Sequence, residues 1–161
     1  MTLTEQKLKT LVLGPQDHRS TEMLDILGQP AMVKLAGSDT NDAVAVLHVT
    51  VPKMSGPPLH RHSREDEWFY VLDGEVTFEV DGQRLQTVSG CSAFAPRGTV
   101  HTFQNFSDTT AHMIVLVTPA GLDRFFEEVT TLNKGLSQPD LAGTEKLMNN
   151  YGVEMLGPPL T

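Results

Sequence analysis

Three histidines and one glutamate near the middle of the chain have the types and spacing of a metal site. His60 and His62 are two positions apart in His-Arg-His, and residues at that spacing share one face of a β-strand. Glu67 follows shortly after them, and His101 follows the turn-rich segment 95–99. Three neutral imidazoles and a carboxylate that converge in one cavity are good ligands for a divalent first-row metal. Each residue alone is a weak signal, because a single histidine on a strand is more often a packing or surface residue.

The pattern of residues 67–80 predicts that Glu67 points into the protein interior. Asp73-Gly74 separates two alternating segments, and this dipeptide is typical of a two-residue β-hairpin turn. That register pairs Phe69 with Phe78 and gives one apolar face, which consists of Phe69, Val71, Val76, Phe78 and Val80. Glu67 falls on the same face, where an ionised carboxylate needs a cation or strong hydrogen-bond donors. The sequence therefore predicts a partner for Glu67.

The elements that must position these residues are mostly short β-strands. Strand-like segments occupy 44–51, 67–72, 75–80 and 111–118, and a second Asp-Gly turn lies at 81–82. Many short antiparallel strands with regular turns favour an all-β sandwich or barrel. We expect an N-terminal arm over 1–29, a β-barrel over 30–119, and a C-terminal helix and tail over 120–161 that pack on the barrel.

The C-terminal region predicts helices by its spacing of apolar residues. These residues recur at helical intervals with acidic residues between them: Leu122, Phe125, Phe126, Val129 and Leu132. A second, weaker helix is predicted over 139–148. The tail ends in Gly-Pro-Pro at 157–159, which does not continue a helix.

The composition excludes several classes of protein. The chain has 161 residues, enough for one domain with a core, and a formal net charge of −8. An acidic chain is a poor partner for nucleic acid, and no stretch approaches the about 18 apolar residues of a membrane helix. The first residues do not resemble a signal peptide, and the single cysteine, Cys91, forms no internal disulfide. We therefore expect a cytoplasmic protein with no nucleic-acid or membrane partner.

Two segments resemble the two sequence motifs of the cupin superfamily. In the first, PPLHRHSREDEWFYVLDGE, the matching positions are His60, His62, Glu67 and Gly74. In the second, GCSAFAPRGTVHTFQN, they are Gly90, Pro96, Gly98, His101 and Asn105. One departure is Met54, which stands where the first motif usually has glycine. The departure affects the approach loop and not the ligand positions.

The resemblance implies both a fold and a cofactor. The fold is a double-stranded β-helix (jelly-roll) barrel, with His60, His62, Glu67 and His101 bound to one metal inside it. The metal is a divalent transition metal, one of Fe, Mn, Ni, Co, Cu or Zn, and the sequence does not name which. Four protein ligands leave about two positions open on a metal that prefers octahedral geometry, which suits a catalytic or ligand-binding site.

Three segments, GPPLHRHSREDEWFYVLDGEVTFEVDG, TPAGLDRFFEE and YGVEMLGPPL, are similar to single-domain bacterial cupins related to quercetin dioxygenase. That resemblance implies a dioxygenase that cleaves a flavonol or another enol or aromatic small molecule with O₂. Glu67 would be both a metal ligand and the catalytic proton acceptor. We expect an apolar substrate pocket formed by Phe69, Phe78, Phe94 and Phe103, although four phenylalanines can equally be ordinary core residues.

Two other functions remain open on the sequence. One is a metal-dependent isomerase or epimerase, for which nearby cations, Arg61, Arg64 and Arg97, would hold a phosphate. The other is a small-molecule-binding cupin without turnover. We expect a homodimer, because Trp68 and Tyr70 fall on the outer face of their strand and an apolar sheet face is rarely left bare. Glu65 and Asp66 are expected to be solvated.

Overall fold

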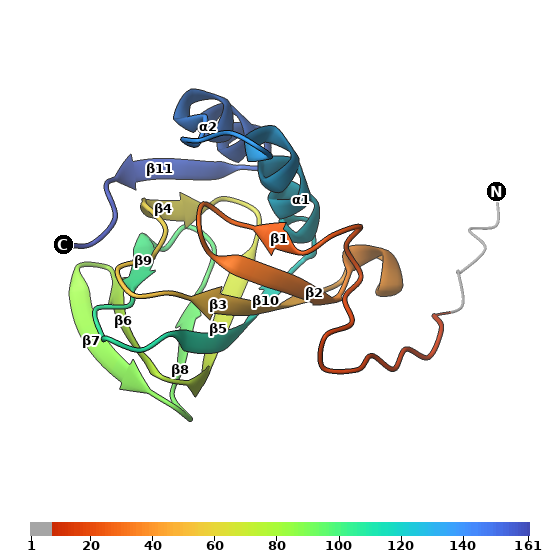
Figure 1. Ribbon diagram of the computed structural model, residues 1–161, viewed down its shortest axis with the longest axis horizontal. Helices are drawn as coiled ribbons and strands as arrows, with labels where there is room; N and C mark the ends of the chain where they lie inside the picture. Colours follow the sequence, from red (N-terminus) through yellow and green to blue (C-terminus); the bar gives the residue numbers. More distant parts are fainter. Residues whose placement is uncertain (1–7) are drawn as a thin grey trace.

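The computed structural model describes residues 8–161 and consists of two β-sheets with two helices at one end (Figure 1). The first seven residues of the predicted arm lie outside the described residues. The strands before the second motif are β1 Leu24–Asp25, β2 Pro30–Leu35, β3 Ala45–Val51, β4 Leu59–His62, β5 Asp66–Asp73, β6 Glu75–Val80 and β7 Gln83–Val88. The remaining elements are β8 Ser92–Ala95, β9 His101–Gln104, β10 Ala111–Thr118, α1 Leu122–Asn133, α2 Leu141–Asn150 and β11 Val153–Gly157, and a short 3₁₀ turn lies at Gly37–Asp39.

The two antiparallel sheets form the double-stranded β-helix that the sequence predicts. One sheet has the order β1-β2-β3-β10-β5-β8, and the other has the order β11-β4-β9-β6-β7. Buried and half-buried residues alternate along the central strands β3 and β10, so each presents one apolar face to the space between the sheets. That space holds the hydrophobic core, and it also holds the four predicted metal ligands.

One of the two predicted hairpins is confirmed and the other is wrong. At Asp81-Gly82 both residues have positive φ, and Val80 pairs with Gln83 across the turn. At Asp73-Gly74 no hairpin forms, because β5 pairs with β10 and β8 while β6 pairs with β9 and β7. The chain instead crosses from one sheet to the other. Gly74 is needed there because its φ is +79° and a Cβ would lie 2.8 Å from the backbone of Ala111.

The predicted inward face survives the error in pairing. Side chains alternate along each strand whichever strand is its neighbour, so Phe69 and Phe78 both point inward from opposite sheets. Their ring centroids are 5.1 Å apart across the core. Glu67 lies on the same inward face and is 5% exposed.

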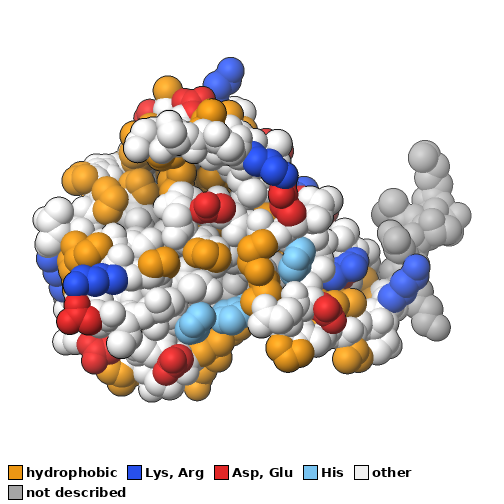
Figure 2. Space-filling view, in the orientation of Figure 1, with side chains coloured by type: hydrophobic (Ala, Val, Ile, Leu, Met, Phe, Trp, Pro, Cys, Tyr) orange, Lys and Arg blue, Asp and Glu red, His pale blue; other side chains and the backbone are white. Residues whose placement is uncertain are grey.

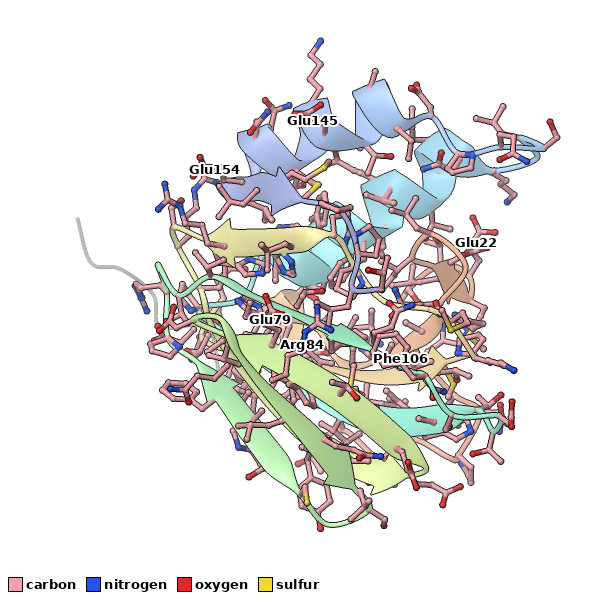
Figure 3. All side chains as sticks on the ribbon, turned by 90° about the vertical axis from the view of Figure 1, so that its left-hand side faces the viewer. Glu22, Glu79, Arg84, Phe106, Glu145 and Glu154 are labelled. Atoms are coloured by element: carbon pink, nitrogen blue, oxygen red, sulfur yellow. The ribbon has the colours of Figure 1, made fainter. Side chains whose placement is uncertain are left out.

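The sheets include strands from both the predicted N-terminal arm and the predicted C-terminal tail. β1 pairs with β2 on the N-terminal side, and β11, which the sequence analysis missed, pairs with β4 on the C-terminal side. The predicted helices are present as α1 and α2, and Figure 3 shows them together with β11 at one end of the barrel. Among residues 8–161, neither helix has the length and apolar character to cross a membrane.

Candidate metal centre

Three strands from the two facing sheets bring four potential metal ligands together. β4 carries His60 and His62, β9 carries His101, and β5 of the facing sheet carries Glu67. All four side chains are buried, and one ligand atom from each lies within 4.8 Å of the others. The group is thus built from both sheets and lies in the interior of the barrel.

Strand geometry explains why the two histidines of β4 converge. His60 and His62 point inward because they are two residues apart, while Arg61 between them points outward and pairs with Glu154 at 2.6 Å. Across the ladder, His60 lies opposite His101, and their ring centroids are 4.5 Å apart. The prediction that His60 and His62 share one face of a strand is therefore confirmed.

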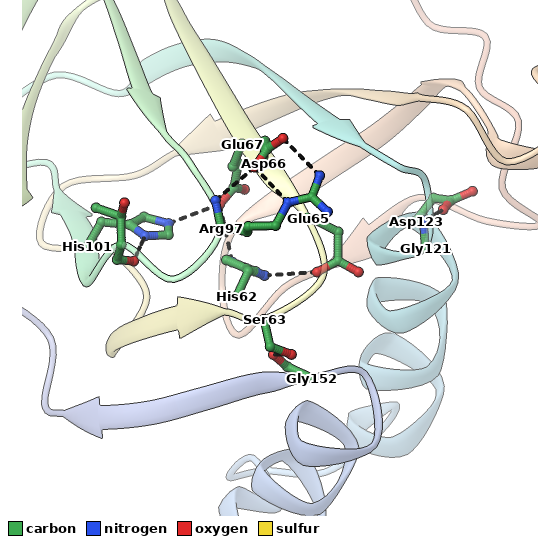
Figure 4. Close-up of polar contacts among 11 residues, drawn as sticks. His62, Ser63, Glu65, Asp66, Glu67, Arg97, His101, Gly121, Asp123 and Gly152 are labelled. Atoms are coloured by element: carbon green, nitrogen blue, oxygen red, sulfur yellow. Dashed lines mark hydrogen bonds and ion pairs between the residues drawn. The ribbon is translucent and has the colours of Figure 1, made fainter.

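Hydrogen bonds to backbone carbonyls orient two of the imidazoles. His60 Nδ1 donates to the carbonyl oxygen of Pro58 at 2.7 Å, and His101 Nδ1 donates to that of Thr99 at 3.0 Å. A neutral imidazole that donates from Nδ1 presents the lone pair of Nε2, which is the form that binds a metal. His101 Nε2 lies 3.0 Å from Glu67 Oε2, as Figure 4 shows.

The charges of this group are strongly coupled. Burial lowers the pKa of His60 to about 3, assisted by repulsion from His101 and His62. Burial also acts to lower the pKa of His62, but attraction by the Glu67 and Glu65 carboxylates outweighs it and raises the pKa to about 9. Burial acts to raise the pKa of Glu67, but His62 and His101 outweigh it and hold that pKa well below its usual range. Without a metal the site is thus an ion pair between His62 and Glu67.

The donor set fits a divalent first-row metal ion. Imidazole nitrogens suit Zn, Cu, Fe and Ni, and a carboxylate oxygen suits harder ions such as Mn, so the mixed set suits ions of this series. Both ring nitrogens of His62 are buried without a geometrically sound hydrogen bond, although Nε2 is 3.2 Å from Glu67 Oε2. A cation at the centre of the group would satisfy Nε2 and replace the proton on His62.

An almost wholly apolar cavity of about 90 Å³ opens onto this group. Its walls include His60, His62 and Glu67 on the metal side, together with Phe69 and Phe103. Phe78 does not line the cavity and instead packs behind these rings, 5.8 Å from the ring of Phe103. The predicted position of Phe94 is wrong, because Phe94 pairs with Trp68 on the outer face and is 57% exposed.

The rest of the cavity wall comes from elements outside the predicted barrel. Helices α1 and α2 contribute Phe125, Phe126 and Val129, with Thr144 and Met148. The tip of the β1–β2 hairpin contributes Ile26, Leu27 and Gln29. The helices therefore cover the barrel mouth. The apolar stripe of α1 is the sequence signal that could have placed them there, whereas nothing in the sequence marks the hairpin tip.

The nearby arginines do not face the cavity. Arg97 forms a two-pronged ion pair with Asp66, and Arg61 pairs with Glu154. No lysine or arginine of residues 8–161 lines the cavity. The expectation for Glu65 is wrong, since its carboxylate is buried beside His62 instead of being solvated. The rings of His48 and His112 lie beside each other, tilted by 43°, on the outer side of the β3–β10 ladder, away from the site.

Comparison with known proteins agrees with this architecture. Residues 47–117 match the cupin domain family. The chain is 34% identical over 82 residues to the quercetin 2,3-dioxygenase of Bacillus subtilis, a match over 51% of this chain and 24% of that protein. It is 27% identical over 96 residues to an oxalate-binding protein of Thermotoga maritima, a match over 60% of this chain and 74% of that protein. The chain thus spans about a quarter of the first of these relatives.

A solved structure shows the same fold. An RmlC-like cupin from Shewanella frigidimarina superimposes with a TM-score of 0.59 at 25% sequence identity. The superposition covers 72% of this chain and 96% of that one.

Proposed function

We propose, from the match of residues 47–117 to the cupin domain family, that the protein is a metal-dependent dioxygenase acting on a compact, uncharged enol. The observation that carries the proposal is the position of the four buried ligands at the end of an almost wholly apolar cavity. A cavity of this kind favours a flat, neutral molecule over a charged one. The similarity to a quercetin 2,3-dioxygenase supports the same reaction class.

Different residues of the chain would have different roles in such a reaction. A bound divalent metal would lower the pKa of a substrate hydroxyl and bring the resulting enolate together with O₂. A Glu67 carboxylate oxygen would accept the hydroxyl proton, because the side chain lines the cavity next to the other ligands. Phe69 and Phe103 would pack against the flat face of the substrate and exclude water.

The size of the cavity narrows the substrate class. An apolar protein cavity of about 150 Å³ is known to hold benzene. The cavity of about 90 Å³ is smaller, so among enols it favours a molecule of at most one ring, such as a 1,3-dione or a single-ring enolone, over a larger one. A flavonol, which has three rings, would enter only if the β1–β2 hairpin tip or helices α1 and α2 moved outward.

Oxygen uptake tests the proposal. The metal-free protein would be loaded separately with Mn, Fe, Co, Ni or Cu and supplied with pentane-2,4-dione, tropolone and 3-hydroxyflavone. We expect uptake that depends on metal and substrate and is lost in His62→Ala. Glu67→Gln should retain bound metal but lose most of the turnover, because an amide does not accept the proton. No uptake with any metal at full loading would overturn the proposal.

A non-catalytic binding function is the second candidate, and the name of the oxalate-binding relative favours it. Calorimetry with the metal-loaded protein would detect binding of oxalate or an enolone. The ligand recovered after incubation in air then separates the two functions, because a binder would leave it unchanged. An isomerase or epimerase of sugar phosphates receives less support, because no lysine or arginine of residues 8–161 lines the cavity to hold a phosphate.

We also propose that the protein is a homodimer that pairs through the outer face of the six-stranded sheet. Trp68 and Tyr70 stack on this face with ring centroids 5.8 Å apart, and Phe94 and Leu72 beside them are exposed. In Figure 2 hydrophobic side chains and histidines lie together on the lower part of the face shown, where β3, β10 and β5 run in Figure 1. Sedimentation should show a dimer of the wild-type protein and a monomer of Trp68→Glu. A wild-type monomer at about 50 μM would contradict the proposal, because a specific interface should form at that concentration.

A further inference from the structure

Glu65 lies next to the metal group although it is not one of its ligands. It ends the short loop between β4 and β5, and only 3% of its surface is exposed. Its neighbours in the sequence behave differently, since Arg64 is exposed and Asp66 pairs with Arg97 at the surface. A buried carboxylate needs a specific partner.

The partner that faces Glu65 is the ring of His62. Glu65 Oε2 lies 3.6 Å from His62 Nδ1, and Figure 4 shows the two side chains directed at each other. Both atoms are buried, and neither has a hydrogen-bond partner within residues 8–161. A shift of a few tenths of an ångström would bring them to hydrogen-bond distance. The other carboxylate oxygen lies near Gly121, the residue before α1, where an added Cβ would be 3.5 Å from Oε1.

His62 is thereby distinguished from the other two histidines. His60 and His101 each donate from Nδ1 to a neutral backbone carbonyl two residues earlier in the chain. Only His62 has a carboxylate at the equivalent position. A carboxylate behind a metal-binding imidazole fixes the ring orientation and the Nδ1–H tautomer, and it makes the opposite nitrogen a stronger donor than a carbonyl does.

We propose that Glu65 is the positioning residue of the metal centre, which holds His62 with Nδ1–H toward Glu65 and Nε2 toward the metal. With Glu65 behind it, His62 is then the strongest metal ligand of the three histidines. Glu65 Oε1 lies near Gly121, so the pair also stands close to the start of the helix that covers the cavity. The inference rests on the metal site alone and is independent of which reaction the site performs.

Zn(II)-loaded protein, which is diamagnetic, allows a direct test by NMR of the imidazole N–H protons. In the wild type we expect the His62 Nδ1–H proton to be the most deshielded of the three and slow to exchange. In Glu65→Leu this signal should move upfield and exchange faster, while the signals of His60 and His101 stay in place. Zn(II) affinity should fall about 10–100-fold, and Glu65→Gln, which keeps an acceptor without the charge, should lose less.

Glu154→Gln is the matched control. It removes the same charge from the strand beside β4, in an exposed ion pair with Arg61, and should leave Zn(II) affinity and the His62 signal unchanged. An unchanged His62 signal in Glu65→Leu, or an equal loss of affinity in Glu154→Gln, would overturn the proposal. If Glu65→Leu does not fold, an unchanged signal and affinity in Glu65→Gln would overturn it as well. Failure of the wild type to bind any metal would instead refute the metal site itself.

Discussion

His60 on β4 lies directly opposite His101 on β9, and their rings are in contact across the ladder. His62 completes the group from the next inward position of β4, and Glu67 completes it from the facing sheet. A metal held by these residues would therefore connect the two sheets of the barrel, so its binding should be visible in the stability of the whole domain.

Metal binding should raise the melting temperature. A ligand that binds only the folded state adds about 2.7 kcal/mol to the free energy of unfolding at a free concentration of 100 Kd. We expect Zn(II) or Ni(II) to raise the melting temperature of the chelator-treated protein by several degrees in scanning calorimetry. His101→Ala should lose this shift. His48→Ala, which removes a histidine from the outer side of the sheet, should keep it, and equal shifts in the two variants would contradict the assignment.

Metal binding should release about one proton near neutral pH. In the metal-free protein the pKa of His62 is raised to about 9, so the ring is protonated at pH 7, while His60, with a pKa of about 3, is already neutral. The metal displaces the His62 proton, so affinity should rise about tenfold per pH unit toward pH 9 and then level off. Calorimetry in buffers with different ionisation enthalpies counts the proton. An affinity that is independent of pH between 6 and 8 would speak against a protonated His62.

The four predicted pocket phenylalanines should differ sharply in their effect on stability. Phe78 is 1% exposed in the core, and Phe78→Ala should lower the free energy of unfolding by about 3–5 kcal/mol. Phe94→Ala on the outer face should cost less than about 1 kcal/mol in the monomer. Urea unfolding of both variants at low protein concentration measures the difference. Similar losses would mean that Phe94 is packed in the core after all.

Widening the cavity at helix α1 should change substrate size preference. Phe126 lines the cavity from α1 and packs against Phe125, so Phe126→Ala should enlarge the space available to a ligand. We expect this variant to bind 3-hydroxyflavone at least about tenfold more tightly than the wild type does, while tropolone binding changes little. Fluorescence titration of the Zn(II)-loaded proteins measures both affinities. Phe106→Ala, an exposed position outside the cavity, is the control, and the same gain there would contradict the size restriction.

The local sequence pattern predicted strands, helices and inward faces, because these depend on residues close together in the chain. Glu67 was correctly placed inside by alternation alone, even though the hairpin used to argue for it does not form. The Asp73-Gly74 error has a physical cause: the turn dipeptide fits any sharp reversal, and only long-range packing decides that β6 leaves the sheet of β5. A crossing between sheets leaves no local mark in the sequence.

Long-range burial also explains what was missed at the site. Glu65 lies in a run of charged residues that is typical of a surface loop, yet it is buried beside His62, and Gly121, which is far away in the sequence, lies close to its other oxygen. The strand β11 follows a helix and precedes two prolines, and it exists because Val153 and its neighbours pair with β4. The hairpin tip at Gln29 reaches the cavity only through the folding of the N-terminal arm onto the barrel.

Isotope labelling of the product tests the proposed dioxygenase activity most directly. The metal-loaded protein would turn over pentane-2,4-dione or tropolone under ¹⁸O₂, and the products would be analysed by mass spectrometry. A dioxygenase breaks one carbon–carbon bond and places both oxygen atoms in the products, with the four electrons that reduce O₂ coming from the substrate. We predict two ¹⁸O atoms per turnover, with His62→Ala giving no product. Product without ¹⁸O, or unchanged substrate at full metal loading, would contradict the account.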